Sequence, residues 1–392
     1  MSSLRIVMAG PFGLSPKGTM AVRALPLARA LAARGHQVKL VMPGWHTQEP
    51  PRLWHDEGVE LEYVALGPWR GHASAPWIVH RMLAAAHAWR PDLIHAFKPK
   101  AYAGLLAWST WQRRHRGGAP ALVVDADDWE GRGGWEQVEP YPAAARALFR
   151  WQEHWGLTHH HGLTVASHAL ETLAWSLGAH PERVCYLPNG STLPSTQPSA
   201  RADRPTVLLY TRLAEFAPER AVAVLTQLAA RVPELKVRVV GQALQPARDE
   251  AFDRAIVATG LASRVERLGW VPVNELPATL TACQVALCPL DDNLINRCRC
   301  SVKLADLVRL GIPVVADAVG EATSYIADGE TGYCVPCGDE SAMIDALARL
   351  LYDPALASRM GRAAQERYAA RFDWEALAAV AEATYERALA NR

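Results

Sequence analysis

The sequence predicts an α/β protein made of two Rossmann-like, doubly wound parallel-sheet domains, and three observations lead to this fold class. The chain has 392 residues, more than twice the usual size of one compact domain. Half of its residues are apolar, which is enough to fill sizeable cores. Short apolar runs alternate with helical patterns over residues 4–166, and the alternation restarts at residue 206, as expected for βαβ units.

The first half of the chain begins with a buried strand and a Gly- and Pro-rich loop. A helix predicted over residues 20–33 ends at Arg34-Gly35, since a basic residue followed by glycine is typical of a helix C-terminus. The other elements predicted in this half are strands at 4–9, 38–42, 61–66, 93–96, 122–125 and 162–166 and helices at 78–89 and 101–113.

A break in the pattern separates the two halves. Residues 191–205 are rich in Ser, Thr, Pro, Ala and Arg and show no apolar periodicity, so we expect an interdomain linker there. It divides a first domain, 1–190, from a second domain, 206–372. Strands of the second domain are predicted at 206–210, 236–240, 265–268, 285–289 and 313–316, and the tail is helical from Asp339, with a turn at Asp353-Pro354 and a last helix over 374–389.

Composition excludes several classes of protein. Lys and Arg total 41 against 40 Asp and Glu, and the net charge of +1 argues against a nucleic-acid binder that relies on overall positive charge. No secretory or membrane-spanning apolar stretch stands out, and seven cysteines do not suit a disulfide framework. We therefore expect a cytoplasmic protein with no nucleic-acid partner.

A glycine-containing loop, Gly13-Leu-Ser-Pro-Lys17-Gly18-Thr19, precedes the first helix. It is not a P-loop, because Thr19 stands where a lysine should follow the second glycine. It still leads into a helix N-terminus, whose unpaired backbone N–H groups attract an anion. The simpler explanation is that a strand-to-helix turn needs glycine in any such fold.

A second pattern runs from Ser301 to Val315, where a helix, a glycine and a proline lead into a buried strand. Lys303 and Asp306 are three residues apart and share one helical face near the helix N-terminus. There they can hold a diphosphate and a ribose diol. The alternative is a surface ion pair, which contributes little to stability.

This second pattern resembles the retaining, GT-B-fold glycosyltransferases of family 4, also called group 1. In that family a glutamate that binds the nucleotide ribose stands five residues before the glycine of a G-x-P-V-V segment, and here Asp306 stands before Gly311-Ile-Pro-Val-Val315. Other family motifs follow in the family's order over almost the whole chain: Gly18-Thr19, Arg34-Gly-His-Gln-Val38, Pro91-Asp-Leu-Ile-His95, Pro188-Asn-Gly190, Gly320-Glu321 and Gly329-Glu-Thr-Gly332.

The resemblance implies two domains facing across a cleft, with the acceptor on the first, the nucleoside-diphosphate sugar on the second, and no metal or other cofactor. It also implies that a C-terminal helix, 373–392, packs back on the first domain. Lys17 and His95 become acceptor-binding candidates, although a buried imidazole is the simpler role for His95. The donor-binding candidates are Gly18, Thr19, Ser301, Val302, Asp306 and Glu321.

The sequence departs from the family pattern at three places. Cys298 stands where the first glutamate of a pair separated by seven residues meets the donor sugar, and Ala217 stands where a lysine follows Thr211-Arg212-Leu213. The histidine that usually ends a first-domain strand also has no counterpart near Asp125. We expect other residues to compensate.

The compensating residues are cations and amides. We expect Arg212 and Lys303 to act as catalytic cations that neutralise the leaving diphosphate, with Arg297 binding the donor beside them. Asn293 and Asn296 can hydrogen-bond sugar hydroxyls in place of the missing carboxylate. The alternative, strongest for Arg299, is a solvated basic loop.

The densest group of acids in the first domain is Asp125, Asp127, Asp128 and Glu130, directly after a predicted strand. Ligands bind at the carboxyl ends of strands in α/β sheets. We expect Asp125 and Glu130 to bind acceptor hydroxyls, and Asp127 and Asp128 to be catalytic and assist deprotonation. An Asx-turn and a helix cap would explain Asp127 and Asp128 without chemistry.

No metal site is predicted. Cys298-x-Cys300 and Cys334-x-x-Cys337 allow zinc as an alternative to small buried residues, but Cys-x-Cys is an unusual half-site. The three histidines at 159–161 are consecutive, so they cannot all face one ion.

Aromatic residues concentrate in the first half, where 12 of the 14 tryptophans lie. They fit ordinary packing or a cleft that stacks on sugars. The segment Trp108–Arg116 combines tryptophans with basic residues at a predicted helix end. It suits either ordinary complementing of the helix dipole or peripheral contact with an anionic membrane surface.

The sequence therefore predicts a glycosyltransferase that moves a sugar from a nucleoside-diphosphate sugar to a hydroxyl of a glycan, a lipid-linked acceptor or a small molecule. Because of Cys298 and the missing lysine, the alternative is a non-catalytic protein of the same fold that binds a nucleotide or glycan or partners another transferase. A sugar-nucleotide epimerase or a phosphorylase is a third hypothesis.

Overall fold

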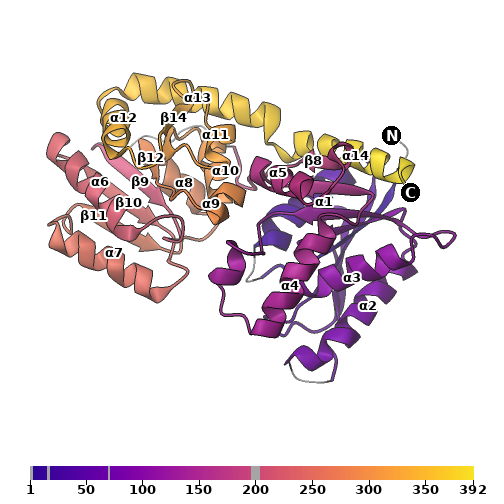
Figure 1. Ribbon diagram of the computed structural model, residues 1–392. Helices are drawn as coiled ribbons and strands as arrows, with labels where there is room; N and C mark the ends of the chain where they lie inside the picture. Colours follow the sequence, from indigo (N-terminus) through magenta and orange to yellow (C-terminus); the bar gives the residue numbers. More distant parts are fainter. Residues whose placement is uncertain (1–2, 16–17, 69–70, 196–203) are drawn as a thin grey trace. The chain divides into compact units, whose positions relative to one another are not determined.

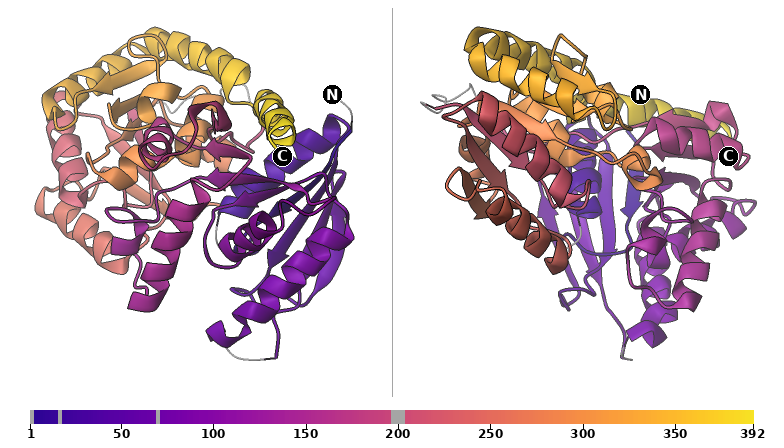
Figure 2. Two further views of the ribbon diagram at one scale, coloured as in Figure 1. Left: turned by 45° about the vertical axis from the view of Figure 1, so that its right-hand side comes forward. Right: turned by 60° about the vertical axis from the view of Figure 1, so that its left-hand side comes forward.

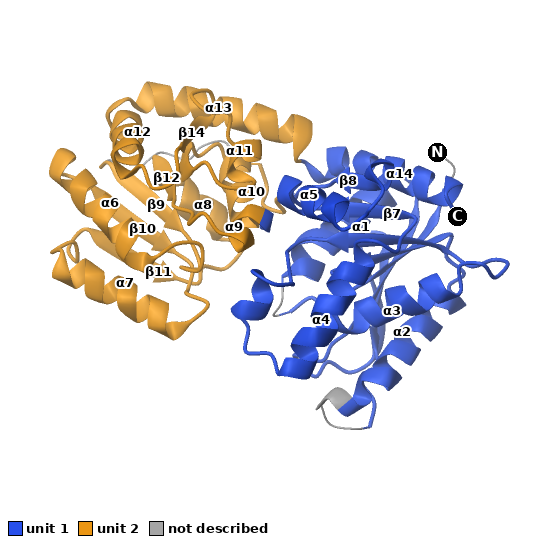
Figure 3. Cartoon of the chain, in the orientation of Figure 1, with its two compact units in different colours: residues 1–190, 298–300, 373–392 blue, residues 191–297, 301–372 orange. Residues whose placement is uncertain are grey.

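The computed structural model describes residues 3–15, 18–68, 71–195 and 204–392. The chain folds into two compact units, residues 1–190, 298–300 and 373–392 and residues 191–297 and 301–372 (Figure 3). The range 206–372 expected for the second domain does not anticipate that residues 298–300 group with the first unit.

The first unit is built on one twisted sheet (Figure 1). Within the described residues this sheet has eight strands, in the order β3 (Arg52–Asp56), β4 (Val59–Val64), β2 (Gln37–Pro43), β1 (Arg5–Ala9), β5 (Leu93–Phe97), β6 (Ala121–Ala126), β7 (Gly162–Val165) and β8 (Val184–Tyr186). Neighbouring strands are parallel from β4 to β8, as predicted, whereas β3 runs antiparallel to β4. The β3–β4 hairpin is a correction to the fully parallel sheet. Its turn residues Glu57 and Gly58 both have positive φ, the geometry of a two-residue hairpin turn.

Helices cover both faces of this sheet because its strand residues point alternately to each side. Ile6 and Met8 of β1 pack with α1 (Leu25–Ala33) and α14 (Trp374–Ala390), whereas Val7 and Ala9 pack with α2 (Ala75–Ala88) and α3 (Ala101–Gln112). The remaining helical segments of this unit are η1 (Met20–Ala24), η2 (Gly71–Ser74), η3 (Trp135–Gln137), α4 (Ala143–Gly156), α5 (His168–Ser176) and η4 (Pro181–Arg183).

The first helix opens with a π-helical turn, η1, that continues into α1. Such turns are frequent at functional sites, since they re-aim side chains within a helix. Here Arg23 of η1 is 1% exposed and turned into the unit. Met20, also in η1, lies so close to Gly10 that a Cβ on this glycine would approach the Met20 sulfur to 1.9 Å, so the end of β1 requires glycine.

The second unit contains a parallel sheet. Within the described residues it has six strands, in the order β11 (Val265–Gly269), β10 (Lys236–Val240), β9 (Thr206–Tyr210), β12 (Val285–Cys288), β13 (Val314–Asp317) and β14 (Gly332–Val335). Helices α6 (Pro218–Arg231) and α7 (Pro246–Ala258) lie side by side (Figure 2). Its other helices are α8 (Leu276–Thr281), α9 (Leu294–Cys298), α10 (Val302–Arg309), α11 (Ala322–Tyr325), α12 (Glu340–Tyr352) and α13 (Pro354–Arg371).

Each sheet has one point where the chain reverses its winding direction. In the first unit the strands on either side of this point are β1 and β5, and in the second unit they are β9 and β12. Open α/β sheets bind ligands outside the carboxyl ends of the strands at such a switch point. In each unit we therefore expect the ligand-binding residues among the candidates that lie at these strand ends.

Within the described part of the chain, no helix is long and apolar enough to cross a bilayer.

Candidate active site

In the first unit, Lys98 and three acids, Asp127, Asp128 and Glu130, form a cluster that we call the first half-site. Lys98 lies at its centre, directly after β5. Its ammonium group lies 3.4 Å from Asp127, 3.0 Å from Asp128 and 3.0 Å from Glu130. These acids follow β6, the neighbour of β5, so parallel pairing alone brings residues some thirty positions apart together. Lys98 has φ of 52°, a strained conformation for a non-glycine residue, of the kind that concentrates at functional sites. The sequence prediction missed Lys98, although Lys-Pro-Lys directly after a buried strand was a usable signal.

Charge pairing sets the protonation of this cluster. Burial alone would lower the pKa of Lys98, but Asp127, Asp128 and Glu130 outweigh burial and raise it well above the usual value. Burial alone would likewise raise the pKa of Asp127, yet Lys98 and Thr19 lower it. For Asp128, burial and the neighbouring Asp127 outweigh Lys98, and its pKa is raised. One site thus holds an ionised acid beside an acid with a higher proton affinity, the arrangement typical of acid–base pairs.

Exposure distinguishes the acids. The side chain of Asp128 is 21% exposed, against 9% for Asp127 and 2% for Glu130. Glu130 is held by Lys98 and by Lys100, whose ammonium group is 2.6 Å from its carboxylate and 2.7 Å from the hydroxyl of Tyr141. Glu130 is therefore a buried partner of two lysines, and this geometry does not support the expected direct contact with an acceptor.

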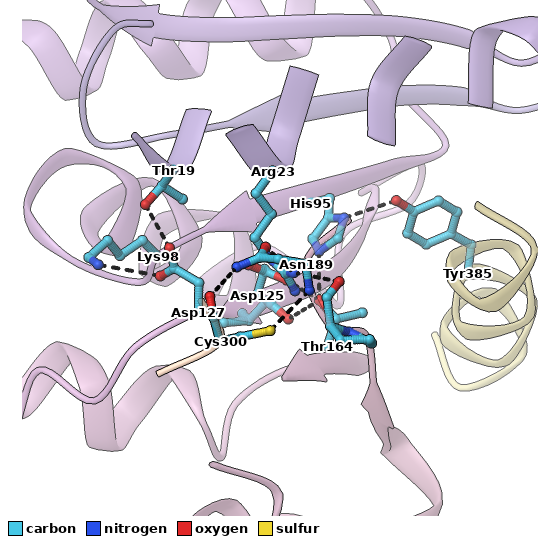
Figure 4. Close-up of polar contacts among 12 residues, drawn as sticks. Thr19, Arg23, His95, Lys98, Asp125, Asp127, Thr164, Asn189, Cys300 and Tyr385 are labelled. Atoms are coloured by element: carbon cyan, nitrogen blue, oxygen red, sulfur yellow. Dashed lines mark hydrogen bonds and ion pairs between the residues drawn. The ribbon is translucent and has the colours of Figure 1, made fainter. Parts of the chain in front are cut away.

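Asp125 and His95 also differ from expectation. Both are fully buried. The Asp125 carboxylate accepts two hydrogen bonds from Arg23, at 2.8 and 2.6 Å, and one from the Thr164 hydroxyl. His95 contacts Thr164 and the hydroxyl of Tyr385 (Figure 4). Their polar atoms already have protein partners, so direct binding of an acceptor by either residue is not supported.

The loop before the first helix ends at Thr19, which contacts an acid of the first half-site. The hydroxyl of Thr19 donates to Asp127 at 2.6 Å. Thr19 therefore holds an acid, whereas a contact with the nucleoside-diphosphate sugar was expected. Gly18 is exposed, and its carbonyl accepts from the N–H of Val22. Lys17, an acceptor-binding candidate, lies outside the described residues.

In the second unit, Asp306 and Lys303 of α10, together with the residues that they contact, form what we call the second half-site. The carboxylate of Asp306 accepts hydrogen bonds from the hydroxyls of Ser191 and Tyr210 and is 5% exposed. Burial raises the pKa of Asp306 to about 7, because two neutral hydroxyls stabilise its charge less than a cation would. The sequence reasoning missed Ser191 and Tyr210, since nothing in their local pattern points to a distant carboxylate.

Lys303 pairs with a partner that the sequence did not suggest. Its ammonium group lies 2.9 Å from Glu215, a buried acid in the loop after β9, rather than pairing with Asp306. Glu215 also accepts from the hydroxyl of Thr211 and the N–H of Ala214. Because an ammonium group has three donors, Lys303 retains capacity for a further acceptor. Arg212, two residues into the same loop, is exposed.

The start of α10 follows a standard capping pattern. The Ser301 hydroxyl accepts from the N–H of Leu304, so this side chain caps the helix. As in any α-helix, the first N–H groups, those of Val302 and Lys303, lack intrahelical partners and face outward along the axis. This end of α10 can therefore receive an anion.

Most of the remaining candidates for binding the sugar donor already form hydrogen bonds or ion pairs within the protein. The amide nitrogen of Asn296 donates to the carbonyls of Glu215 and Asp291, which leaves its side-chain oxygen, without a hydrogen-bond partner among the described residues, for the predicted contact with a sugar hydroxyl. The Asn293 side chain accepts from the N–H of Asn296. Arg297 is exposed and forms a two-pronged ion pair with Asp292. Glu321 is buried at the start of α11.

No disulfide bond joins the seven cysteines, all of which lie in the described part of the chain. Cys298, at the position of the missing glutamate, is fully buried, as is nearly all of Cys300. Among the described residues, no three His, Cys, Asp or Glu side chains are grouped closely enough to hold a metal ion. Two residues of the histidine run have structural roles: His161 accepts from the N–H of Leu122, and His160 contacts the carbonyl of Leu157.

Comparison with known families accounts for both halves of the chain. Residues 18–190 match a glycosyl transferase 4-like domain, and residues 204–353 match the glycosyl transferases group 1 domain. The chain belongs to the group 1, family 4 glycosyltransferases. The family predicted from the sequence motifs is thereby confirmed, and so is the enzyme class, a glycosyltransferase.

Two curated relatives of this glycosyltransferase match over nearly their full length. A D-inositol 3-phosphate glycosyltransferase of Stackebrandtia nassauensis is 26% identical over 97% of this chain and 90% of its own. A phosphatidyl-myo-inositol mannosyltransferase of Mycobacterium leprae is 24% identical over 98% of this chain and 96% of its own.

Solved structures confirm the GT-B fold. A sucrose-phosphate synthase from Thermosynechococcus elongatus superposes with a TM-score of 0.76 at 21% identity, covering 99% of this chain and all of its own. An Anabaena protein crystallised with UDP-glucose superposes with a TM-score of 0.69 at 18% identity, covering 97% and 99% of the two chains. Likenesses at this level of identity establish the architecture and no more.

Proposed function

We propose that this glycosyltransferase moves a sugar from a nucleoside-diphosphate sugar to an acceptor hydroxyl, with retention at the anomeric carbon and without a metal ion. Residues 206–372 bind the donor; residues 1–190, joined by the linker 191–205 and completed by the helix 373–392, bind the acceptor. Support for the donor class comes from the Anabaena protein, which was crystallised with UDP-glucose and with UDP.

The observation that carries this proposal is the group of acids around Lys98. Asp128 is the most exposed of the three acids and has the raised pKa, so it is suited to accept a hydrogen bond from an acceptor hydroxyl and then its proton. Asp127 is held ionised by Lys98 and Thr19, and it orients the same hydroxyl and stabilises positive charge that develops on the sugar.

The second half-site supplies the complementary chemistry. As the glycosidic bond breaks, the leaving diphosphate gains negative charge. Lys303, Arg212 and the N–H groups at the start of α10 provide donors and positive charge for it. This supports a reaction that needs no metal, because these groups supply the charge that a metal ion otherwise brings. Asp306 accepts hydrogen bonds from the ribose hydroxyls in exchange for those from Ser191 and Tyr210.

The two relatives described above are named for inositol phosphate and phosphatidyl-myo-inositol, so we propose a polyol bearing a phosphate as the first acceptor to try, free or lipid-linked. Trp108 is 41% exposed, and Arg114 stacks on Trp111. These residues support peripheral contact of a cytoplasmic enzyme with a membrane surface.

A thermal-shift screen against UDP, GDP, ADP, dTDP and their sugar conjugates tests donor binding. A ligand that binds the native state raises the melting temperature by mass action, and a selective shift identifies the base. Sugar transfer to inositol phosphates is then followed by mass spectrometry. Nucleotide binding without turnover on any acceptor would favour the non-catalytic alternative, which the buried Cys298 in place of the family glutamate motivates.

A further inference from the structure

A buried hydrogen-bond network connects the C-terminal helix to the acids of the first half-site (Figure 4). At one end, Tyr385 of α14 contacts His95 Nδ1 at 2.9 Å. His95 Nε2 lies 3.1 Å from the hydroxyl of Thr164, which donates to Asp125 at 2.6 Å. Asp125 in turn holds Arg23 through two hydrogen bonds. All five residues are at most 1% exposed.

The direction of each hydrogen bond follows from a proton count. Asp125 pairs with a guanidinium and is an acceptor, so the single hydroxyl hydrogen of Thr164 points to Asp125. Thr164 must therefore accept from His95 Nε2–H. Burial and the nearby Arg23 keep the pKa of His95 well below its usual value, so the ring is neutral and its Nδ1 accepts from the hydroxyl of Tyr385. Every donor points toward Asp125, which makes the network mutually reinforcing.

The far end of the network is the helical turn that supports Asp127. Thr19 and Arg23 are four residues apart at the start of the first helix, so they lie on one face. Thr19 holds Asp127 and Arg23 holds Asp125, two acids from the same end of β6. Arg23 also donates to the side chain of Asn189 at 3.0 Å. A shift of Arg23 would therefore move the support of Asp127.

We propose that Tyr385 is a positioning residue, which acts through His95, Thr164, Asp125 and Arg23 to hold Thr19 and Asp127 in their working geometry. This inference rests on the proposed function, in which Asp127 orients the acceptor hydroxyl. It gives α14 a role in catalysis beyond covering the sheet. Phenylalanine at position 385 would fill the same apolar space, so the hydroxyl is the group that requires explanation.

The test compares Tyr385→Phe with Thr384→Val. Thr384 is the adjacent residue on α14 and is buried as well, and among the described residues its hydroxyl donates only to the carbonyl of Val380 in its own helix. Both variants lose one buried hydroxyl. We expect Tyr385→Phe to lower kcat about tenfold with donor KM unchanged, because a small misplacement of a reacting group is costly. Thr384→Val should leave kcat within twofold of the wild type. Equal kcat in the two variants would overturn the proposal.

Two measurements keep the result independent of turnover. Nitrogen-15 NMR of the histidines should show His95 neutral with its proton on Nε2, and a proton on Nδ1 would contradict the network. Carbon-13 NMR should show the Asp127 carboxyl titrating at higher pH in Tyr385→Phe than in Thr384→Val, because weaker contacts stabilise its charge less. If the wild type transfers no sugar, the proposed function fails, and the titration of Asp127 still decides the positioning role.

Discussion

The two half-sites lie in units built around parallel strands, but their acids have different kinds of partner. After β5 and β6, a buried ammonium group contacts three carboxylates, and a guanidinium neutralises a fourth. After β9 and in α10, Asp306 is held by two hydroxyls, while Lys303 pairs with Glu215. In the first half-site each carboxylate thus has a cation as a direct partner. In the second, the hydrogen-bond partners of Asp306 are neutral hydroxyls, and burial outweighs them and the more distant Lys303 and Arg309, so the pKa of Asp306 is raised and its ligand binding and stability become sensitive to pH.

The largest expected effect comes from removing the cation of the first half-site. Lys98→Met leaves three buried carboxylates without their common partner, and breaking a buried ion pair in this way costs about 3–5 kcal/mol. Urea unfolding measures the loss. Lys100→Met is the matched control, because Lys100 contacts Glu130 and Tyr141 but leaves Lys98 in place. Similar losses for the two variants would contradict the central role of Lys98.

The second effect separates chemistry from donor binding. Asp128→Asn keeps the size of the side chain but removes a proton acceptor, so we expect kcat to fall by about 10²–10³. The Kd for the nucleoside diphosphate, measured by calorimetry, should stay within twofold of the wild-type value. If kcat is unchanged, Asp128 does not act as the base, and a structural role in an Asx-turn is favoured for this residue.

The third effect concerns the division of labour between the half-sites. Asp306→Ala removes the ribose partner and should raise the nucleotide Kd about tenfold, the cost of a hydrogen bond to a charged group. Asp127→Ala should raise it less, since Asp127 lies in the other unit. Calorimetry on both variants compares the two values directly. Equal increases would falsify the assignment of the donor to the second unit.

Much of the fold could be predicted because buried parallel strands give continuous apolar runs. Each predicted strand has a counterpart in the structure, within a few residues at its ends. The hairpin strand β3 was missed, since Arg52–Asp56 has no buried residue: its Leu53 is exposed, and only Trp54 and Asp56 are partly buried. The segment α4 was missed as well. Its apolar residues Leu148 and Trp151 are exposed while its polar residues Gln152 and Glu153 are buried, so the apolar residues do not mark the face that packs on the unit.

The candidate site was predictable to the extent that it is local in sequence. Asp127 and Asp128 follow a strand end, so their place at the carboxyl edge could be inferred. Their partners Lys98 and Thr19 come from other segments, and only strand order brings them together. The same holds for Glu215 with Lys303 and for Ser191 with Asp306. Burial also could not be read from the motif, which is why Asp125 and His95 were expected to meet a ligand and instead pair internally.

The smallest expected effect is the pH response of Asp306, and it sharpens the comparison most directly. With a pKa of about 7 in the folded protein, Asp306 is largely protonated at pH 6 and largely ionised at pH 8. The ionised form accepts ribose hydroxyls better, so nucleotide affinity should weaken about fivefold from pH 8 to pH 6 if the protonated form binds as weakly as Asp306→Ala. Calorimetry across this range, with Asp306→Asn as control, separates this response from the titration of the ligand's own phosphates. Equal pH dependence in the wild type and the variant would exclude Asp306 as the titrating group.

The raised pKa of Asp306 also predicts how the stability of the folded protein changes with pH. Its folded pKa lies above its unfolded value near 4, so between these values the folded state holds more protons than the unfolded state. The contribution of Asp306 to stability is therefore present at low pH and is lost as pH rises through about 7. Asp127 and Glu130, whose pKa values are lowered, contribute in the opposite direction, and their stabilisation is lost as pH falls below 4. Unfolding of Asp306→Asn at pH 5 and pH 8 should accordingly show a smaller decrease in stability with rising pH than the wild type. An identical decrease would mean that hydroxyl partners alone hold the Asp306 charge as well as Lys98 holds the charges in the first half-site.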